Sequence, residues 1–345
     1  MRTPYMNITN RCVIIRLMAV LLPLAAANAQ ISIAVPGAPK GDIQTELLQS
    51  RTYCRSLEKQ LEAVKKQFPG LSIEVLAASA SWNSSPFASG CNAIEAQMIE
   101  QAGEKATTLL REMDSKTWKE AQKYVGITTV EEARDFLTLV DRRAKGAIEV
   151  EMVRGNLLWN YKPFQESPEK EWALGYSREV IHTVNAALKV TFQIPMSWKI
   201  EDLPKTEWML FRNCYGHGNV WMTVQVSPIV DASGRPVSAQ EHFNSYSENS
   251  LKTDYESFGI KLNSFSKTKV NSMPALMITR DQVYEQLGQK ATLATEGIWV
   301  FVNDHTIRFE INTLGPEGER KAAARIEKNQ KLFKMIGGSV RVTLK

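Results

Sequence analysis

The spacing of apolar residues changes near residue 180, and this change constrains the fold more than any other feature of the chain. Before that point apolar side chains recur every three or four residues, as on one face of an amphipathic helix. Beyond it they alternate with polar side chains, as in Leu188, Val190 and Phe192, each followed by a polar residue. The chain is therefore expected to be α+β, with a helical N-terminal module followed by an antiparallel sheet flanked by helices.

Four helical segments are predicted in the first half of the chain: 41–67, 91–112, a piece through Trp118–Tyr124, and 128–146, which opens with a capping-box pattern at Thr128 and Glu131. Apolar residues at helical spacing mark 41–67, and Pro69-Gly70 ends that pattern. A second helix is expected over 91–112. Between them, a short apolar stretch leads into a polar segment around Trp82–Gly90, which carries no helical pattern.

The length of 345 residues suggests two domains, at roughly 100–200 residues each. We expect a mostly helical module over 30–146 and an α+β domain over 180–345. Between them, 147–179 is predicted to be a connector, because its later part is polar and contains prolines.

The second half resembles the PsbP/Mog1-like fold, from its order of strands and from several short motifs. The matching segments are Thr191–Trp198, Phe211–Gly218, the helix after Ser238, the Trp299–Ile311 hairpin, and Leu332–Ile336 before Ser339. The resemblance implies an antiparallel sheet between helices. It also implies a binding, assembly or accessory role, because members of that fold share no catalytic residues that could be assigned here.

The N-terminus has the three parts of a secretory signal peptide. Residues 1–16 are basic and carry no acid, Leu17–Leu24 is a short apolar run, and Ala27–Ala29 has small residues at the cleavage positions. The apolar run is shorter than the ~20 residues that span a bilayer. We expect cleavage of 1–29 near Ala29/Gln30 and a periplasmic protein that is not integral to the membrane; an uncleaved anchor is the alternative.

The basic character of the chain belongs partly to this signal. The formal net charge is +5, and three of the basic residues, Arg2, Arg11 and Arg16, lie before the expected cleavage point. The remaining sequence has no stripe of Lys and Arg interleaved with aromatic residues, which a nucleic-acid interface favours. No nucleic-acid partner is expected.

Three of the four cysteines follow the signal segment: Cys54, Cys91 and Cys214. Cys54 lies in the first predicted helix and Cys91 begins the second, so an oxidising compartment would favour a disulfide between them. The alternatives are two free thiols or a pairing with Cys214.

Cys214 and His217 form the most suggestive local cluster for catalysis. An imidazole near a thiol can lower its pKa and accept its proton, which would make an exported hydrolase. The C-x-x-H spacing is weak, and a turn between two strands explains it better. No phosphate-binding loop, nucleophile elbow or zinc-binding spacing is present, so no cofactor and no metal site are expected.

Tryptophan is more informative about binding. Of eight tryptophans, four lie in connector-like or loop-like sequence: Trp82, and the three chosen as candidates, Trp159, Trp172 and Trp208. Exposed tryptophans are favoured anchors at interfaces, so these three are candidate binding residues. Trp159 and Trp172 are candidates for lining a cleft between the two halves.

The sequence favours an exported, non-enzymatic protein that binds another protein in the periplasm. One specific form of this hypothesis is an immunity or inhibitor protein that masks an effector acting in the envelope. The alternatives are the Cys214/His217 hydrolase, or a small ligand or metal held in the interdomain cleft.

Overall fold

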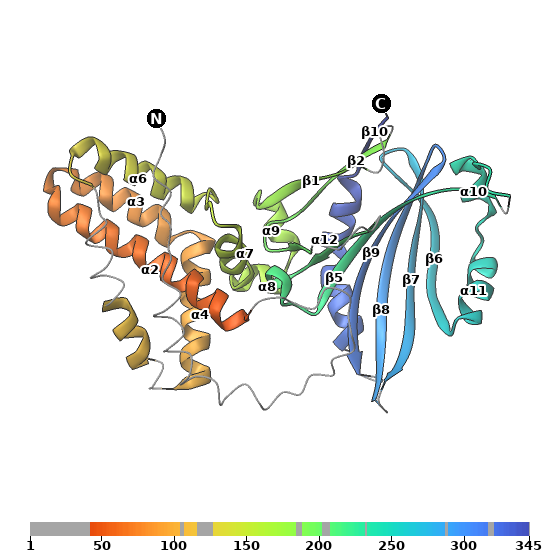
Figure 1. Cartoon of the computed structure of the whole chain (residues 1–345), viewed down its shortest axis with the longest axis horizontal. Helices are drawn as coiled ribbons and strands as arrows, with labels where there is room; N and C mark the ends of the chain where they lie inside the picture. The colour runs from red at the N-terminus through yellow and green to blue at the C-terminus, as the bar shows by residue number, and fades with distance from the viewer. Residues whose placement is uncertain are drawn as a thin grey trace.

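The computed structural model describes residues 42–103, 107–115, 127–183, 188–201, 208–231, 233–286, 289–316 and 321–344. A group of helices comes first in the chain and lies beside two β-sheets along the long axis of the molecule (Figure 1). The expected signal segment, 1–29, and the helical piece predicted through Trp118–Tyr124 lie outside the described residues. Within the described ranges, no helix is both long and apolar enough to cross a bilayer.

The helices of the first half form their own apolar core. In chain order the elements are α2 (Ile43–Gln67), η2 (Pro69–Leu71), α3 (Ser72–Asn83), α4 (Pro86–Ala102), α6 (Val130–Ala144), α7 (Glu151–Trp159), α8 (Lys162–Glu166) and α9 (Glu169–Ala173). A further helical segment covers 107–115. The side chain of Asp42 caps α2 by accepting from the backbone of Gln44, and α2 ends at Phe68 before Pro69.

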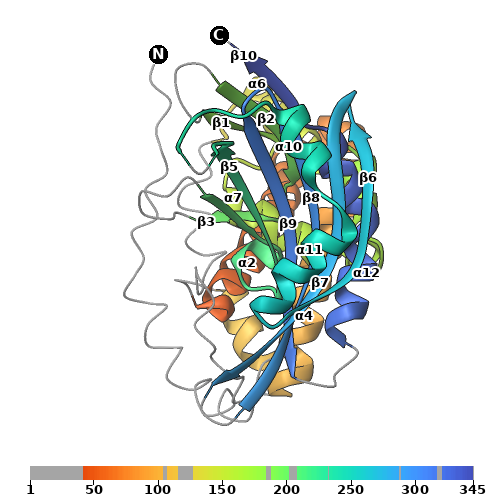
Figure 2. The ribbon, with the colours of Figure 1, turned by 90° about the vertical axis from the view of Figure 1, so that its right-hand side faces the viewer.

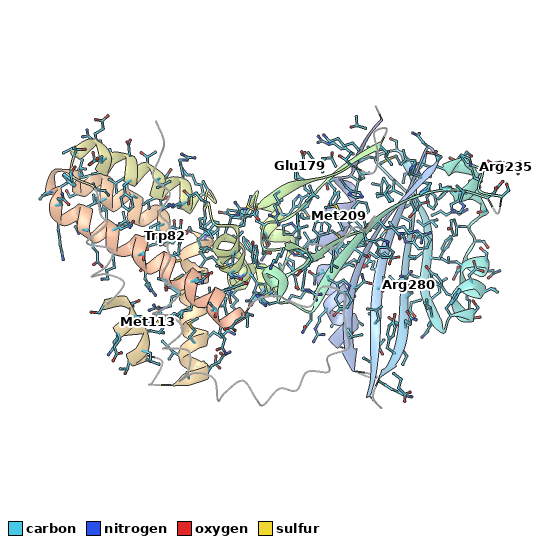
Figure 3. The ribbon with its side chains drawn as sticks, viewed as in Figure 1. Trp82, Met113, Glu179, Met209, Arg235 and Arg280 are labelled. Carbon is cyan, nitrogen blue, oxygen red and sulfur yellow. The ribbon has the colours of Figure 1, made fainter. Side chains whose placement is uncertain are left out.

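The polar segment expected around Trp82–Gly90 is helical in the structure. Trp82, labelled among the helices in Figure 3, lies in α3. Its side chain is fully buried. Ser85 caps α4 by accepting from the backbone of Ala88, with Pro86 in the first helical position. Apolar and small residues lie on both the buried and the exposed side of α3, so its sequence does not show which face is buried.

The segment 147–179, predicted as a connector, contains three short helices that pack into both cores. Ile148, Leu157 and Phe164 are buried in the helical core. Trp172 packs against the core of the sheets. This segment is therefore folded against both halves of the chain.

Two antiparallel sheets form the second half. The strands are β1 (Ser177–Thr183), β2 (Leu188–Pro195), β3 (Lys199–Glu201), β4 (Trp208–Arg212), β5 (Val220–Pro228), β6 (Ile260–Val270), β7 (Met273–Gln286), β8 (Gln289–Val302), β9 (His305–Pro316) and β10 (Arg341–Leu344). The small sheet has the order β1-β2-β10, and the large sheet has the order β3-β4-β5-β9-β8-β7-β6. The predicted α+β class with an antiparallel sheet is confirmed.

Helices cover the two faces of the large sheet unequally. The helix α12 (Lys321–Gly338) packs on one face through Phe333 and Ile336, against strand residues such as Phe309. On the opposite face lie α10 (Ala239–Ser245) and α11 (Glu248–Ser257). Figure 2 shows α10 and α11 in front of the strands toward β6, with β9 and β5 beside them. We call this second side the front face.

Candidate functional site

The Cys214–His217 loop lies at the junction between the helices and the sheets. It contains η3 (Cys214–Gly216), which joins β4 to β5 and contacts α7. The ring of Tyr215 packs against Gly155 of α7, where an added Cβ would lie 2.2 Å from Cδ2 of that ring. Cys214 and Tyr215 both have positive φ, 52° and 43°, a conformation that non-glycine residues adopt at some cost. The loop is shaped to place Tyr215 on α7.

His217 is held by a carboxylate from the first helix. Its Nε2 lies 3.0 Å from Oε2 of Glu46, in α2, and the two side chains are 6 % and 17 % exposed. Burial alone would raise the pKa of Glu46, but the hydrogen bond and charge of His217, with the charge of Lys199, lower it overall. The imidazole therefore ties the sheets to α2.

The thiol of Cys214 is not activated in this setting. Burial raises its pKa well above the ordinary value, and the negative charge of Glu46 raises it further. A thiol nucleophile needs the opposite shift, toward the thiolate. Among the residues that the structure describes, no three His, Cys, Asp or Glu side chains gather in a way that could hold a metal ion.

A buried carboxylate makes a second link at the junction. Glu171 of α9 is 3 % exposed. It accepts hydrogen bonds from the backbone nitrogen of Ser197 at 2.8 Å and from its hydroxyl at 2.6 Å. Burial raises the pKa of Glu171 to about 7, although the hydrogen bonds from Ser197 and Met196 act in the opposite direction. The loop after β2 is thereby fixed to the helices.

Cys54 and Cys91 lie together in the helical core as free thiols, each with no exposed surface. Burial raises the pKa of Cys54, and a hydrogen bond with Cys91 adds to that effect. The two cysteines are thus brought together as the sequence suggested. The disulfide between them stays a prediction.

The three candidate tryptophans have different surroundings. Trp159 ends α7 and is partly buried. Trp172, also partly buried, packs against the sheet core. Trp208, at the start of β4, is 45 % exposed. Because Met209 faces the α12 side and side chains alternate along a strand, Trp208 lies on the front face.

Trp208 begins a row of polar and aromatic side chains across the front face. Trp208 pairs with Gln225 of β5, Gln225 with Arg308 of β9, and Arg308 with Trp299 of β8. We call these four residues the Trp208 row. Gln225 and Arg308 are partly exposed, and Trp299 is buried. The row crosses four neighbouring strands of the large sheet.

Arg308 of β9 has no described carboxylate beside it, unlike Arg280 of β7 on the same sheet. Arg280, labelled on the strands in Figure 3, lies 2.9 Å from Oε2 of Glu310 and 2.9 Å from the hydroxyl of Tyr255. The guanidinium of Arg308 stacks 4.2 Å from the ring centroid of Trp299. In the described part of the chain, no carboxylate lies within ion-pair distance of Arg308, and its Nε is buried without a hydrogen-bond partner.

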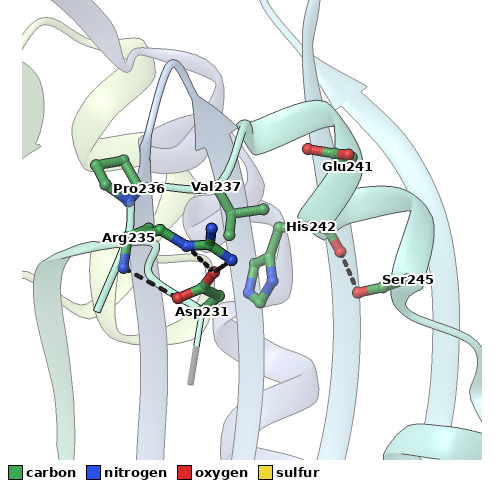
Figure 4. Close-up of a pocket in the computed structure, with 7 residues that line it drawn as sticks. All are labelled: Asp231, Arg235, Pro236, Val237, Glu241, His242 and Ser245. Atoms are coloured by element: carbon green, nitrogen blue, oxygen red, sulfur yellow. Dashed lines mark hydrogen bonds and ion pairs between the residues drawn. The ribbon is translucent and has the colours of Figure 1, made fainter. Parts of the chain in front are cut away.

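A pocket of about 470 Å³ lies between α10 and the loop that precedes it (Figure 4). Its lining includes His242 of α10 and the loop residues Asp231 and Arg235. Hydrogen bonds from Ser233 and Arg235 lower the pKa of Asp231 to about 2. Burial lowers the pKa of His242, as does the positive charge of Arg308. Nε2 of His242 lies 3.2 Å from the hydroxyl of Tyr246.

This pocket is not at the junction, where the sequence suggested a ligand cleft. Its lining comes from the loop after β5 and from α10, at the far end of the sheets. Sequence reasoning missed both the pocket and Arg308. In the pattern Thr306–Ile311, alternation shows that Arg308 faces away from α12, but nothing local shows that it lacks a carboxylate partner.

Comparison with known proteins gives matches to solved structures alone. No family model and no curated protein matches the chain. PsbP from Synechocystis sp. PCC 6803 is 13% identical, over 48% of this chain and 92% of that chain, with a TM-score of 0.31. The Ran-binding protein Mog1p of Saccharomyces cerevisiae is 12% identical, over 48% and 94%, with a TM-score of 0.33.

A third match is LpqN, involved in cell envelope biogenesis of Mycobacterium tuberculosis. It is 8% identical, over 51% of this chain and 96% of that chain, with a TM-score of 0.32. The matches to PsbP and Mog1 confirm the predicted resemblance to the PsbP/Mog1-like fold. At this level the likeness concerns the fold alone, over about half of the chain, and carries no argument about partners or activity.

Proposed function

We propose that the chain is an exported, non-enzymatic binding protein that holds a segment of another periplasmic protein on its front face. The observation that carries this proposal is the Trp208 row. It combines a tryptophan that is 45 % exposed with an arginine that no described carboxylate matches. Tryptophan and arginine are the side chains that most often anchor protein interfaces.

The row sets the chemistry of the partner segment. A partly desolvated guanidinium favours a carboxylate that can accept two parallel hydrogen bonds. Trp208 offers an apolar ring to a side chain farther along the same segment. The segment therefore presents an acidic residue to Arg308 and an apolar residue to Trp208, with Gln225 between them.

Catalysis by Cys214 and His217 has little support from their geometry. The raised pKa of Cys214 disfavours the thiolate, and His217 contacts Glu46. Both residues are better explained by the contact between the sheets and the helices.

The location and the specific role are further parts of the proposal. Export rests on the signal-type sequence of residues 1–29. In its specific form, the partner is an effector acting in the envelope, and the chain is an immunity or inhibitor protein that masks it. The division into 30–146, 147–179 and 180–345 is retained as the proposed domain organisation.

Capture from periplasmic extract tests the binding face. The purified chain is immobilised in parallel with Trp208→Ala, Arg308→Gln and the control Leu174→Ala, since Leu174 is 65% exposed at the end of α9. We expect one protein to be retained by the wild type and the control, and to be reduced at least about tenfold by each front-face variant. Equal retention by all four, or no retained protein, would overturn the proposal.

Export is tested separately, by sequencing the N-terminus of the chain recovered from the periplasm. We expect it to begin near Gln30. Recovery of the full-length chain from the cytoplasm alone would contradict the proposed periplasmic location. The capture experiment would still test the front face, because it does not depend on export.

A further inference from the structure

The helix α3 carries an apolar stripe on its outer side. Ile73 and Leu76 are 80% and 70% exposed, two of the three most exposed large apolar side chains among the described residues. Ala77 and Ala80 are exposed at the next positions of the same helical face. We call these four residues the α3 face. Single exposed apolar residues are common, but a continuous stripe indicates an interaction surface.

Charged residues border the α3 face along α6. The side chain of Arg134 lies 3.8 Å from Glu74, and seven residues farther along both helices, Ser81 bonds Asp141 at 2.9 Å. The two helices therefore run parallel. Lys145 lies 2.6 Å from Asp141. One end of the border thus carries Arg134 with Glu74, and the other carries Asp141 with Lys145.

We propose that the α3 face docks against the same face of a second copy of this chain, with the two α3 helices antiparallel. A twofold axis in the plane of contact and perpendicular to α3 brings identical surfaces together. Small side chains at Ala77 and Ala80 allow the two helices to approach closely. Ile73 and Leu76 then lie across the contact from the opposite end of the other helix.

The charged border is self-complementary in this arrangement. The same axis leaves both α6 helices on one side of the contact and reverses their direction. Arg134 then faces Asp141 of the partner subunit, and Glu74 faces Lys145 of the partner subunit. With parallel α3 helices, a twofold axis along them would put the two α6 helices on opposite sides of the contact, and these charges would not meet. The complementarity of this surface with itself favours a second copy over an unrelated protein.

Sedimentation of the purified full chain at increasing concentration tests the proposal. We expect the mass to rise from 38.8 kDa toward twice that value, and the rise to weaken at high salt. Leu76→Glu should weaken association at least about tenfold, because it places a charge in the contact. The control Leu174→Glu, on an exposed residue of another surface, should associate as the wild type does.

A charge exchange tests the antiparallel geometry. Arg134→Glu alone should weaken the dimer, and adding Asp141→Arg should restore it, because the opposite charges again face each other. Circular dichroism and thermal unfolding check that each variant is folded. A wild type that stays monomeric up to about 1 mM, or a double variant that is no better than Arg134→Glu, would overturn the proposal.

Discussion

The junction loop and the Trp208 row of the front face each contain a basic and an aromatic side chain, but within the described ranges only the basic side chain at the junction has a carboxylate beside it. At the junction, His217 meets Glu46 at 3.0 Å, and Tyr215 fits against Gly155. On the front face, Arg308 stacks on Trp299, but no described carboxylate matches its charge. A basic group that is buried with a carboxylate contributes to the fold, whereas a partly desolvated charge that no carboxylate matches favours binding.

The local sequence suggests that function lies at Cys214 and His217, whereas the structure favours the front face. Cys214 and His217 look chemical in sequence because thiol and imidazole are close together. In the structure the important neighbour of His217 is Glu46, far away along the chain. Junction substitutions are therefore expected to lower stability, and front-face substitutions to lower binding with little change in stability.

The largest expected effect is at the contact of Tyr215 with α7. Gly155→Val places atoms where an added Cβ would lie 2.2 Å from the Tyr215 ring. We expect the free energy of unfolding to fall by about 3 kcal/mol, measured by urea denaturation. The control Gly70→Val has open space around it and should lose less than about 1 kcal/mol. Equal losses of unfolding free energy in the two variants would show that the contact of Tyr215 with α7 does not stabilise the fold.

The second prediction concerns pH and Glu171. Its pKa is about 7 in the folded chain against an ordinary value of 4.5, so the folded state binds the proton more tightly. The free energy of unfolding should therefore fall as pH rises from about 4.5 to about 7, by on the order of 2–3 kcal/mol.

Glu171→Gln should abolish this part of the pH dependence while it retains an acceptor for the backbone of Ser197. The quantity to measure is the difference between wild type and variant over that range, because other titrating groups contribute equally to both. Parallel stability curves would contradict the burial of a titrating carboxylate at the junction.

A smaller effect is expected from the pair of Glu46 and His217. A double-mutant cycle with Glu46→Ala and His217→Ala should give a coupling energy of about 1.5 kcal/mol, as for hydrogen bonds to charged groups. Because the pKa of Glu46 is lowered in the folded chain, its contribution is present above its ordinary value of 4.5. It is lost as pH falls through the lower folded value. Additive single losses would show that the contact contributes nothing.

The smallest effects on stability should come from the front face. Trp208→Ala and Arg308→Gln are expected to change the free energy of unfolding by less than about 1 kcal/mol, by chemical denaturation. Trp208 is 45 % exposed, and Arg308 forms no described ion pair whose loss would strand a buried charge. A loss of several kcal/mol from either variant would make these residues structural.

Much of the fold follows from local patterns in the sequence. Alternation over Leu188–Ile194 predicts β2, and the cap at Ser238 predicts the start of α10. The helix after that cap is divided, because Ser247 makes a second cap that begins α11. The sequence predicts neither α3 nor the start of α4. Small and apolar residues occupy most positions of α3, so apolar residues do not stand out at a spacing of three or four.

The candidate site depends on pairings that local patterns do not contain. Trp208 was identified because an exposed tryptophan in a loop-like context is an interface signal. Arg308 looks in sequence like any solvent-facing residue of a half-buried strand. Its meaning comes from cross-strand neighbours, and those depend on the order of strands in the sheet.

The central claim is that the Cys214–His217 loop joins the two halves while the Trp208 row binds a partner. It is tested most directly by measuring the affinity of the captured protein for two folded variants, His217→Ala and Arg308→Gln. We expect the first variant to bind as the wild type does, and the second to bind at least about tenfold more weakly. Loss of binding by His217→Ala with full binding by Arg308→Gln would contradict the account.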